Sequence, residues 1–272
     1  MREDSSVLAV FLLLCASAAL GIYVRSHLPE RHRTRETIEL MQITIGLLVT
    51  FAALVLGLLT ASVKQRYDGA AQDRQQYALN LTMLDQCLRD YGPDTAAARA
   101  NIRSYTAAVI ASTWPAEPPP TGIQYPDPRA MPRVGASPAL AGLMNQVGLE
   151  ITRLTPADPP HAKLLDMCLD RYKDVTRARL GVIEDARTQL FEPFYGVLAF
   201  WLMIIFACFG LVAPRSVLSF IVIGLCAISL SSVTFVILDL SRPYQGYFAI
   251  PSTTMRAALH AMEADTPQLS PR

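Results

Sequence analysis

The chain has 272 residues, of which 51% are hydrophobic and only 17% are charged, whereas soluble domains usually carry about 25% charged residues. Its formal net charge is +1, which excludes the strongly basic character that nucleic-acid binding requires. The apolar residues are concentrated in four blocks, so the composition indicates a membrane protein.

The four apolar blocks cover residues 7–24, 40–63, 194–213 and 217–238, and none contains an ionised side chain. Each is long enough to cross a hydrocarbon layer of about 30 Å as a helix. The first block has some features of a signal peptide, but its apolar run is longer than a usual signal core. We therefore predict an all-α integral membrane protein with four transmembrane helices in two hairpins, which flank a helical extramembrane domain.

This interpretation divides the chain into four segments. Residues 1–63 form the first transmembrane hairpin, and residues 64–192 form the helical extramembrane domain, which includes a proline-rich loop at 115–138. Residues 193–240 form the second hairpin. Residues 241–272 form a turn and a short helix that begins after Ser252.

Within the extramembrane domain, helical spacing and proline positions define the expected elements. A 4-3-4-3 pattern of large apolar residues is typical of a bundle helix, and it comprises Tyr77, Leu81, Leu84, Leu88 and Tyr91. Gly92-Pro93 should end this helix, and a second is expected over 95–114. Ser137-Pro138 and Pro159-Pro160 should open two more, because proline fits the first helical turn.

The cysteines and the missing motifs limit the possible chemistry. Three of the five cysteines lie in apolar blocks, whereas Cys87 and Cys168 lie in the polar middle. Those two can pair only if the region faces an oxidising compartment and their helices are adjacent. No CxxC pair, Cys/His cluster or common catalytic motif occurs, so we expect no metal site, no cofactor and no catalytic residues.

Charge does not decide the orientation of the chain. The loop after the first span is basic and should be cytoplasmic by the positive-inside rule; it holds Arg25, Arg31, Arg33 and Arg35. The other side carries a similar number of basic residues, which are Arg2, Lys64, Arg66, Arg74 and Arg242. The two counts nearly cancel, so both orientations stay open on this criterion.

The second span carries the first set of candidate functional residues. Small residues share one face of it and allow another backbone to approach; they are Gly46, Thr50, Ala53 and Gly57. The simpler interpretation is a tight helix–helix contact. The alternative is a pore wall, with Phe51 beside this face as a hydrophobic constriction.

A second set of candidates follows the fourth span and comprises Asp239, Arg242, Pro243, Tyr244 and Gly246. Arg242 and Tyr244 suit the headgroup region, while Pro243 stops the helix and Gly246 permits a turn. Asp239 is expected to pair with Arg242 or to cap a neighbouring segment, and a ligand-binding role is the alternative.

Three short segments give the chain a resemblance to a known family. They are Gly57-Leu58-Leu59 followed by Tyr67-Asp68, the 164–179 helix leading into the third span, and the segment from Asp239 to Gly246 that ends in Pro-Tyr-Gln-Gly. Over roughly residues 40–262 the chain resembles the bacterial bestrophin-like family. The resemblance implies a likeness to bestrophins, which are pentameric anion channels with a pore-lining second span and a cytoplasmic helical part.

On this resemblance, the face from Gly46 to Gly57 would line the conduit and Phe51 would be the nearest match to the aromatic neck. The chain departs from bestrophins in having one aromatic residue there instead of several, and in lacking their acidic calcium-binding run. Our first hypothesis is therefore a homo-oligomeric ion channel, pentameric if the resemblance holds, in a bacterial inner membrane with a cytoplasmic middle domain.

The alternative hypothesis is a membrane-anchored scaffold or sensor whose helical domain binds a partner without conduction. The expected partners are the lipid bilayer, further copies of the chain and small ions, without nucleic acid.

Overall fold

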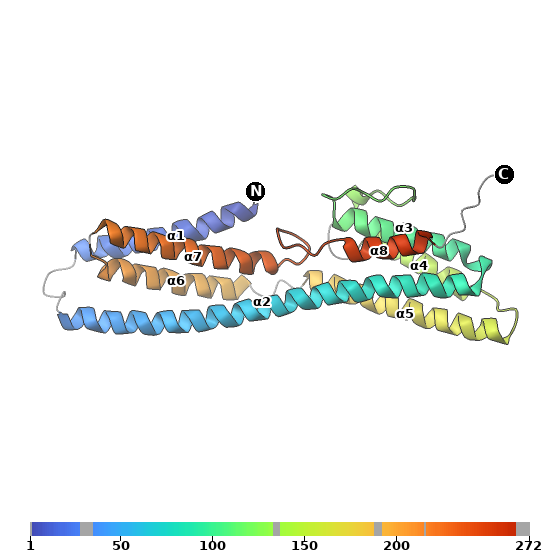
Figure 1. Ribbon diagram of the computed structural model, residues 1–272, viewed down its shortest axis with the longest axis horizontal. Coiled ribbons are helices and arrows are strands. Elements are labelled where there is room, and N and C mark those ends of the chain that lie inside the picture. Colours follow the sequence, from blue (N-terminus) through green and yellow to red (C-terminus); the bar gives the residue numbers. More distant parts are fainter. Residues whose placement is uncertain (1, 28–34, 133–136, 188–191, 215, 265–272) are drawn as a thin grey trace. The chain divides into compact units, whose positions relative to one another are not determined.

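The computed structural model describes residues 2–27, 35–132, 137–187, 192–214 and 216–264, and these fold into helices and connecting segments without a strand (Figure 1). The α-helices, in chain order, are α1 (Arg2–His27), α2 (Arg35–Tyr91), α3 (Ala96–Thr113), α4 (Pro138–Thr152), α5 (Pro159–Arg187), α6 (Glu192–Val212), α7 (Val217–Leu240) and α8 (Thr253–Ala264). The all-α prediction is confirmed.

The chain forms two compact units. The span unit comprises 1–67 and 189–248, and the helical unit comprises 68–188 and 249–272. Helix α2 is continuous through residue 67, where the first unit ends. Both units are therefore built from segments that are distant in the sequence.

The span unit contains the predicted membrane-crossing helices. In the described part of the chain, α1, α2 and α7 each have a stretch long and apolar enough to cross a membrane. The described apolar part of α6 is slightly shorter and covers Gly196–Val212. Helix α6 covers Glu192–Val212, so both of its ends lie within two residues of the predicted span at 194–213.

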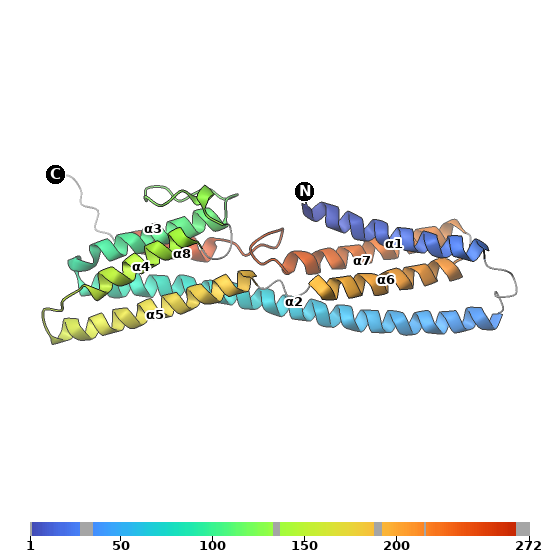
Figure 2. The same ribbon diagram turned by 180° about the vertical axis from the view of Figure 1, so that it is seen from behind.

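The buried centre of the span unit takes residues from all four helices, namely Leu14 and Ala18 of α1, Leu59 and Val63 of α2, Leu198, Leu202 and Phe206 of α6, and Ala227 and Ile237 of α7. Helix α1 packs along α6 and also contacts α7 (Figures 1 and 2). The first span thus packs extensively against the second hairpin. Many other apolar side chains of these helices remain exposed, as expected for a surface solvated by lipid.

The helical unit buries the predicted stripe of α2. Tyr77, Leu81, Leu84, Leu88 and Tyr91 are all buried, which confirms the 4-3-4-3 pattern. Helix α2 ends just before Gly92, whose φ of 122° lies in a region that glycine adopts at low cost. The start of α4 is capped by the Ser137 hydroxyl, which accepts a hydrogen bond from the Leu140 backbone N–H.

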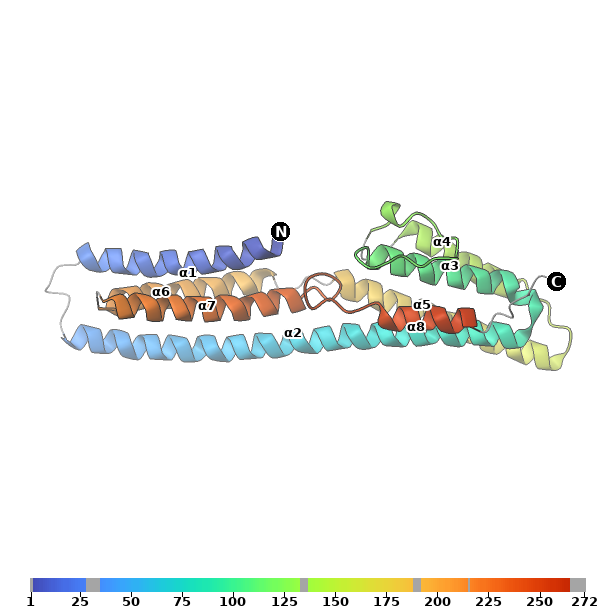
Figure 3. The same cartoon turned by 45° about the horizontal axis from the view of Figure 1, so that its top comes forward.

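Helix α8 completes the helical unit and lies along α3 (Figure 3). It buries Met255, Ala258, Leu259 and Met262. The Trp114 indole N–H, at the end of α3, donates to the Ile250 carbonyl at 2.8 Å. Glu117 then accepts hydrogen bonds from Ser252 and from the Arg256 guanidinium, the latter at 3.0 Å. These contacts fasten the C-terminal segment to the beginning of the proline-rich loop.

Candidate functional site

The first candidate surface is the exposed face of α2 within the span unit. Ile45, Ala52, Leu59 and Val63 face the core of this unit, whereas Gly46, Thr50, Ala53 and Gly57 are all exposed. A methyl group at position 46 or 57 would meet no described atom within 4 Å. The Thr50 hydroxyl donates to the Gly46 carbonyl at 2.9 Å, so it is satisfied within its own helix. The small-residue face is thus uncovered in a single subunit.

Phe51 belongs to a different face of α2. Because successive residues of an α-helix are about 100° apart, Phe51 lies about 140° around the helix axis from Gly46. Its side chain is 49% exposed, and its exposed neighbours on that side are Leu47, Leu54 and Leu58. The small-residue face and the Phe51 face therefore cannot both point at one central axis.

A close helix crossing in the span unit lies elsewhere, between α1 and α6. A Cβ atom at Gly21 would overlap the Ala207 carbonyl oxygen, and one at Gly210 would overlap the Ala18 carbonyl oxygen. The Ser17 hydroxyl also donates to the Met203 carbonyl. Small residues on facing helices permit this approach. The sequence signals for this crossing are Ser17-x-x-x-Gly21 in the first span and Ala207-x-x-Gly210 in the third. We did not identify either motif from the sequence.

The second candidate set is organised around the Asp239 carboxylate. Asp239 is 3% exposed and lies at the end of α7. Its two carboxylate oxygens accept backbone N–H bonds from Tyr247 at 3.0 Å and from Phe248 at 2.7 Å. Gly246 has a φ of 95°, and a Cβ atom there would overlap the same carboxylate. Asp239 thus caps the returning loop, which is one of the two roles expected of it.

The other residues of this motif form the turn between α7 and that loop. The Arg242 backbone N–H donates to the Asp239 carbonyl at 3.0 Å, and the Gln245 N–H donates to the Arg242 carbonyl at 3.0 Å. Pro243 follows the end of α7, and Tyr244 is 6% exposed. The motif therefore brings Asp239 and Gly246 together, while Tyr244 is buried instead of lying on the surface.

A polar cluster lies inside the helical unit, which the sequence analysis did not single out. The Tyr77 and Tyr105 hydroxyls are hydrogen-bonded to each other, and burial raises the pKa of both phenols. A cavity of about 40 Å³ adjoins them and is also lined by Arg74 and Arg179. The Arg74 guanidinium lies 5.0 Å from the centre of the Trp114 ring. This volume is enough for one or a few water molecules.

A pair of carboxyl groups lies on the same two helices, α2 and α5. Burial, followed by the charge of Asp73 and its hydrogen bond, raises the pKa of Asp185 to about 6. One Asp185 carboxylate oxygen is buried without a hydrogen-bond partner. Asp185 therefore holds its proton more tightly than an ordinary carboxyl group, because burial and a neighbouring carboxylate both oppose its ionisation.

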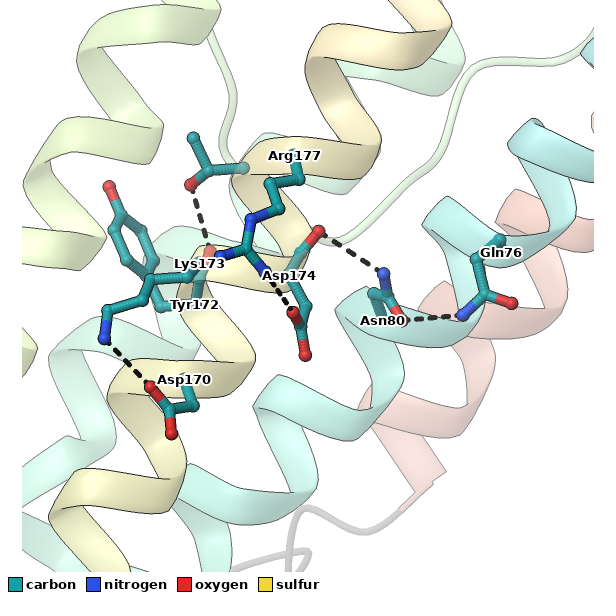
Figure 4. Close-up of polar contacts among 8 residues, drawn as sticks. Gln76, Asn80, Asp170, Tyr172, Lys173, Asp174 and Arg177 are labelled. Atoms are coloured by element: carbon teal, nitrogen blue, oxygen red, sulfur yellow. Dashed lines mark hydrogen bonds and ion pairs between the residues drawn. The ribbon is translucent and has the colours of Figure 1, made fainter.

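Helices α2 and α5 are also joined covalently. Cys87 and Cys168 form a disulfide with their Cα atoms 5.6 Å apart, which we call the interhelical disulfide. Further along the same two helices, the Asn80 side-chain amide donates to the Asp174 carbonyl at 3.4 Å (Figure 4). The sequence left open whether these two cysteines pair, because pairing requires an oxidising compartment and adjacent helices. The structure satisfies the second condition, since α2 and α5 are adjacent. Within the described residues, no three potential metal ligands cluster.

Comparison with known proteins gives a fold and a family. A mutant of a bacterial bestrophin homolog from Klebsiella pneumoniae, solved as a crystal structure, is 16% identical, has a TM-score of 0.61 and is matched over 97% of this chain and 98% of its own. The crystal structure of another membrane protein is 17% identical, with a TM-score of 0.62 and coverages of 95% and 97%. No curated protein matches. The bestrophin-like domain family matches residues 12–255, and the chain therefore belongs to the bestrophin-like family.

Proposed function

We propose that this protein is the subunit of a homo-oligomeric ion channel, selective for anions, in a bacterial inner membrane, and that it has no catalytic activity. Membership of the bestrophin-like family supports this assignment, as do the apolar helices of the span unit. By analogy with bestrophins, five copies surround the conduit, and α2 of each copy contributes to its wall.

The observation that carries the proposal is the uncovered small-residue face of α2. From Gly46 to Gly57 this face has no packing partner among the described residues of its own subunit. In a bilayer such a face is covered by lipid, by a neighbouring helix or by water. Small side chains give lipid little contact area but allow a second backbone or a water-filled conduit to come close. When several copies assemble around an axis, they supply both a neighbouring helix backbone and a central conduit.

Reconstitution into liposomes tests conduction directly. We expect purified protein to release chloride from loaded vesicles, with slower movement of potassium, and the flux should scale with the amount of assembled oligomer. If neither anions nor cations move across a range of pH and voltage, while the protein remains assembled, the channel proposal is wrong. The scaffold or sensor hypothesis then becomes the better interpretation.

A matched pair of substitutions identifies the face that lines the conduit. Thr50 and Phe51 are neighbours in the chain but lie about 100° apart around α2, and both are exposed in the subunit. In a background without the cysteines of the spans, Thr50→Cys and Phe51→Cys should differ in block by a water-soluble thiol reagent. We expect rapid block of Thr50→Cys and little effect on Phe51→Cys.

The opposite order would assign the conduit to the face of Phe51, Leu47 and Leu54, with the small residues then packing between subunits. Equal and slow modification of both variants would exclude α2 as the wall.

A further inference from the structure

We propose that the helical unit lies outside the cytoplasm, on the oxidising side of the membrane, where a thiol oxidase closes the interhelical disulfide as the unit folds. This orientation is opposite to the cytoplasmic placement that the family resemblance implies. The inference does not depend on conduction, because it concerns only which compartment the unit occupies.

The first observation is how the cysteines are distributed. Five cysteines occur in the chain, and three of them, Cys15, Cys208 and Cys226, are free and lie in the membrane-crossing helices. The remaining two form the interhelical disulfide. Every cysteine outside the spans is therefore oxidised. Disulfides persist in oxidising compartments and are rare in the bacterial cytosol, where thiols are kept reduced.

The second observation is that this disulfide is buried. Cys168 is fully buried and Cys87 is 8% exposed, and the two helices that carry them are also joined by the hydrogen bond from Asn80 to the Asp174 carbonyl. Redox-sensing cysteines are accessible to solvent, because an oxidant or a partner thiol must reach them. A bond in this position is structural, so it is made in the compartment where the unit folds.

The third observation concerns the short connections on the other side of the membrane. The first joins the first two spans and carries Arg25, Arg31, Arg33 and Arg35, and the second, at 214–216, carries Arg215. Both are short, and basic residues in short loops decide orientation. Lys64 and the basic residues that follow it belong to a segment of well over 60 residues, and segments of that length are translocated largely regardless of charge. Within about 20 residues of the spans, the short terminal segments on the other side carry Arg2, Arg242 and Arg256, against five basic residues in the two connections. This difference favours a cytoplasmic position for the connections.

The proposed oxidation balances as a two-step thiol exchange. The Cys87 thiolate attacks the disulfide of the oxidase, which forms a mixed disulfide and releases one oxidase thiolate. The Cys168 thiolate then attacks the sulfur of Cys87, which forms the interhelical disulfide and releases the second oxidase thiolate. Two electrons pass to the oxidase, and the two cysteines lose their two protons. The burial of Cys168 requires that this step precede final packing.

Thiol trapping in cells tests the redox state. The protein carries replacements of the three span cysteines by alanine, and cells are quenched in acid before denaturation and reaction with a polymer-linked maleimide. In the normal host we expect no mass shift without reduction and two adducts after reduction. In a host that lacks its extracytoplasmic thiol oxidase, we expect two adducts even without reduction. Two free thiols in the normal host would overturn the proposal.

Labelling of intact cells tests the compartment independently. Thr121 in the proline-rich loop and Ser26 at the end of α1 are both exposed, so Thr121→Cys and Ser26→Cys form a matched pair. A maleimide that cannot cross the inner membrane should label Thr121→Cys in intact cells, and Ser26→Cys only after permeabilisation. The reverse pattern would refute the orientation even if the disulfide proved to be formed.

Discussion

The substitution Gly246→Ala tests the capping of the post-span loop by the Asp239 carboxylate. Alanine at this φ of 95° costs about 1–2 kcal/mol of backbone strain. Its Cβ also displaces the carboxylate, and each of the two backbone N–H bonds to this charged group contributes about 1.5–3 kcal/mol. Because partial relaxation is expected, we estimate a total loss of about 3–5 kcal/mol.

A double-mutant cycle separates the two causes. In an Asp239→Ala background the overlap disappears, so Gly246→Ala should cost only the strain of about 1–2 kcal/mol. The assay is the apparent melting temperature of the protein in mild detergent. At about 2–4 °C per kcal/mol for a chain of this size, Gly246→Ala alone should lower it by about 10 °C. An equal decrease in both backgrounds would refute the proposed contact.

Three further predictions use the same melting assay. Gly21→Ala should destabilise the protein by about 1–3 kcal/mol, because its Cβ overlaps the Ala207 carbonyl at the α1–α6 crossing. Gly196→Ala on α6, whose Cβ would meet no described atom within 4 Å, is the control, and equal effects would contradict the crossing. Asp185 has a folded pKa of about 6 against an ordinary 3.8, so the folded state binds this proton more tightly than the unfolded state. The stabilisation from the bound proton is complete below about pH 4 and is lost as pH rises through 6. After allowance for solvent screening, wild type should lose about 1 kcal/mol more than Asp185→Asn between pH 5 and 7.5, and identical pH profiles would exclude this cause. Reducing the interhelical disulfide, which spans 81 residues, should cost up to about 4.5 kcal/mol on the loop-entropy estimate, and an unchanged melting temperature would show that it does not constrain the unfolded chain.

Helix boundaries were predicted well because backbone chemistry sets them locally. Gly92-Pro93 does end α2, Pro138 does begin α4 after the Ser137 cap, and Pro159 does begin α5. Proline lacks an N–H and fits only the first helical turn, so these positions depend little on tertiary structure. The apolar blocks were equally informative, because a bilayer imposes length and composition on each crossing helix.

Contacts between distant segments were harder to predict. The sequence drew attention to the small residues of α2, but the close approach of α1 and α6 involves Gly21 and Gly210, which are far apart in the chain. Spacing identifies a small-residue face without identifying its partner. The role of Asp239 was left between alternatives for the same reason, since its hydrogen-bond donors, Tyr247 and Phe248, are backbone groups of a loop without a regular pattern.

The division of the helical unit into 68–188 and 249–272 has a consequence for biosynthesis. Helix α8 covers α3, and the segment just before it supplies the Ile250 carbonyl that accepts from Trp114. Both are translated only after the last two spans. Synthesis of the intervening residues, 189–248, takes roughly 3–12 s at the usual rate of translation. During that interval the surface of α3 that binds α8 stays uncovered. Docking of α8 onto α3 therefore occurs only in a chain whose last two spans have already been synthesised.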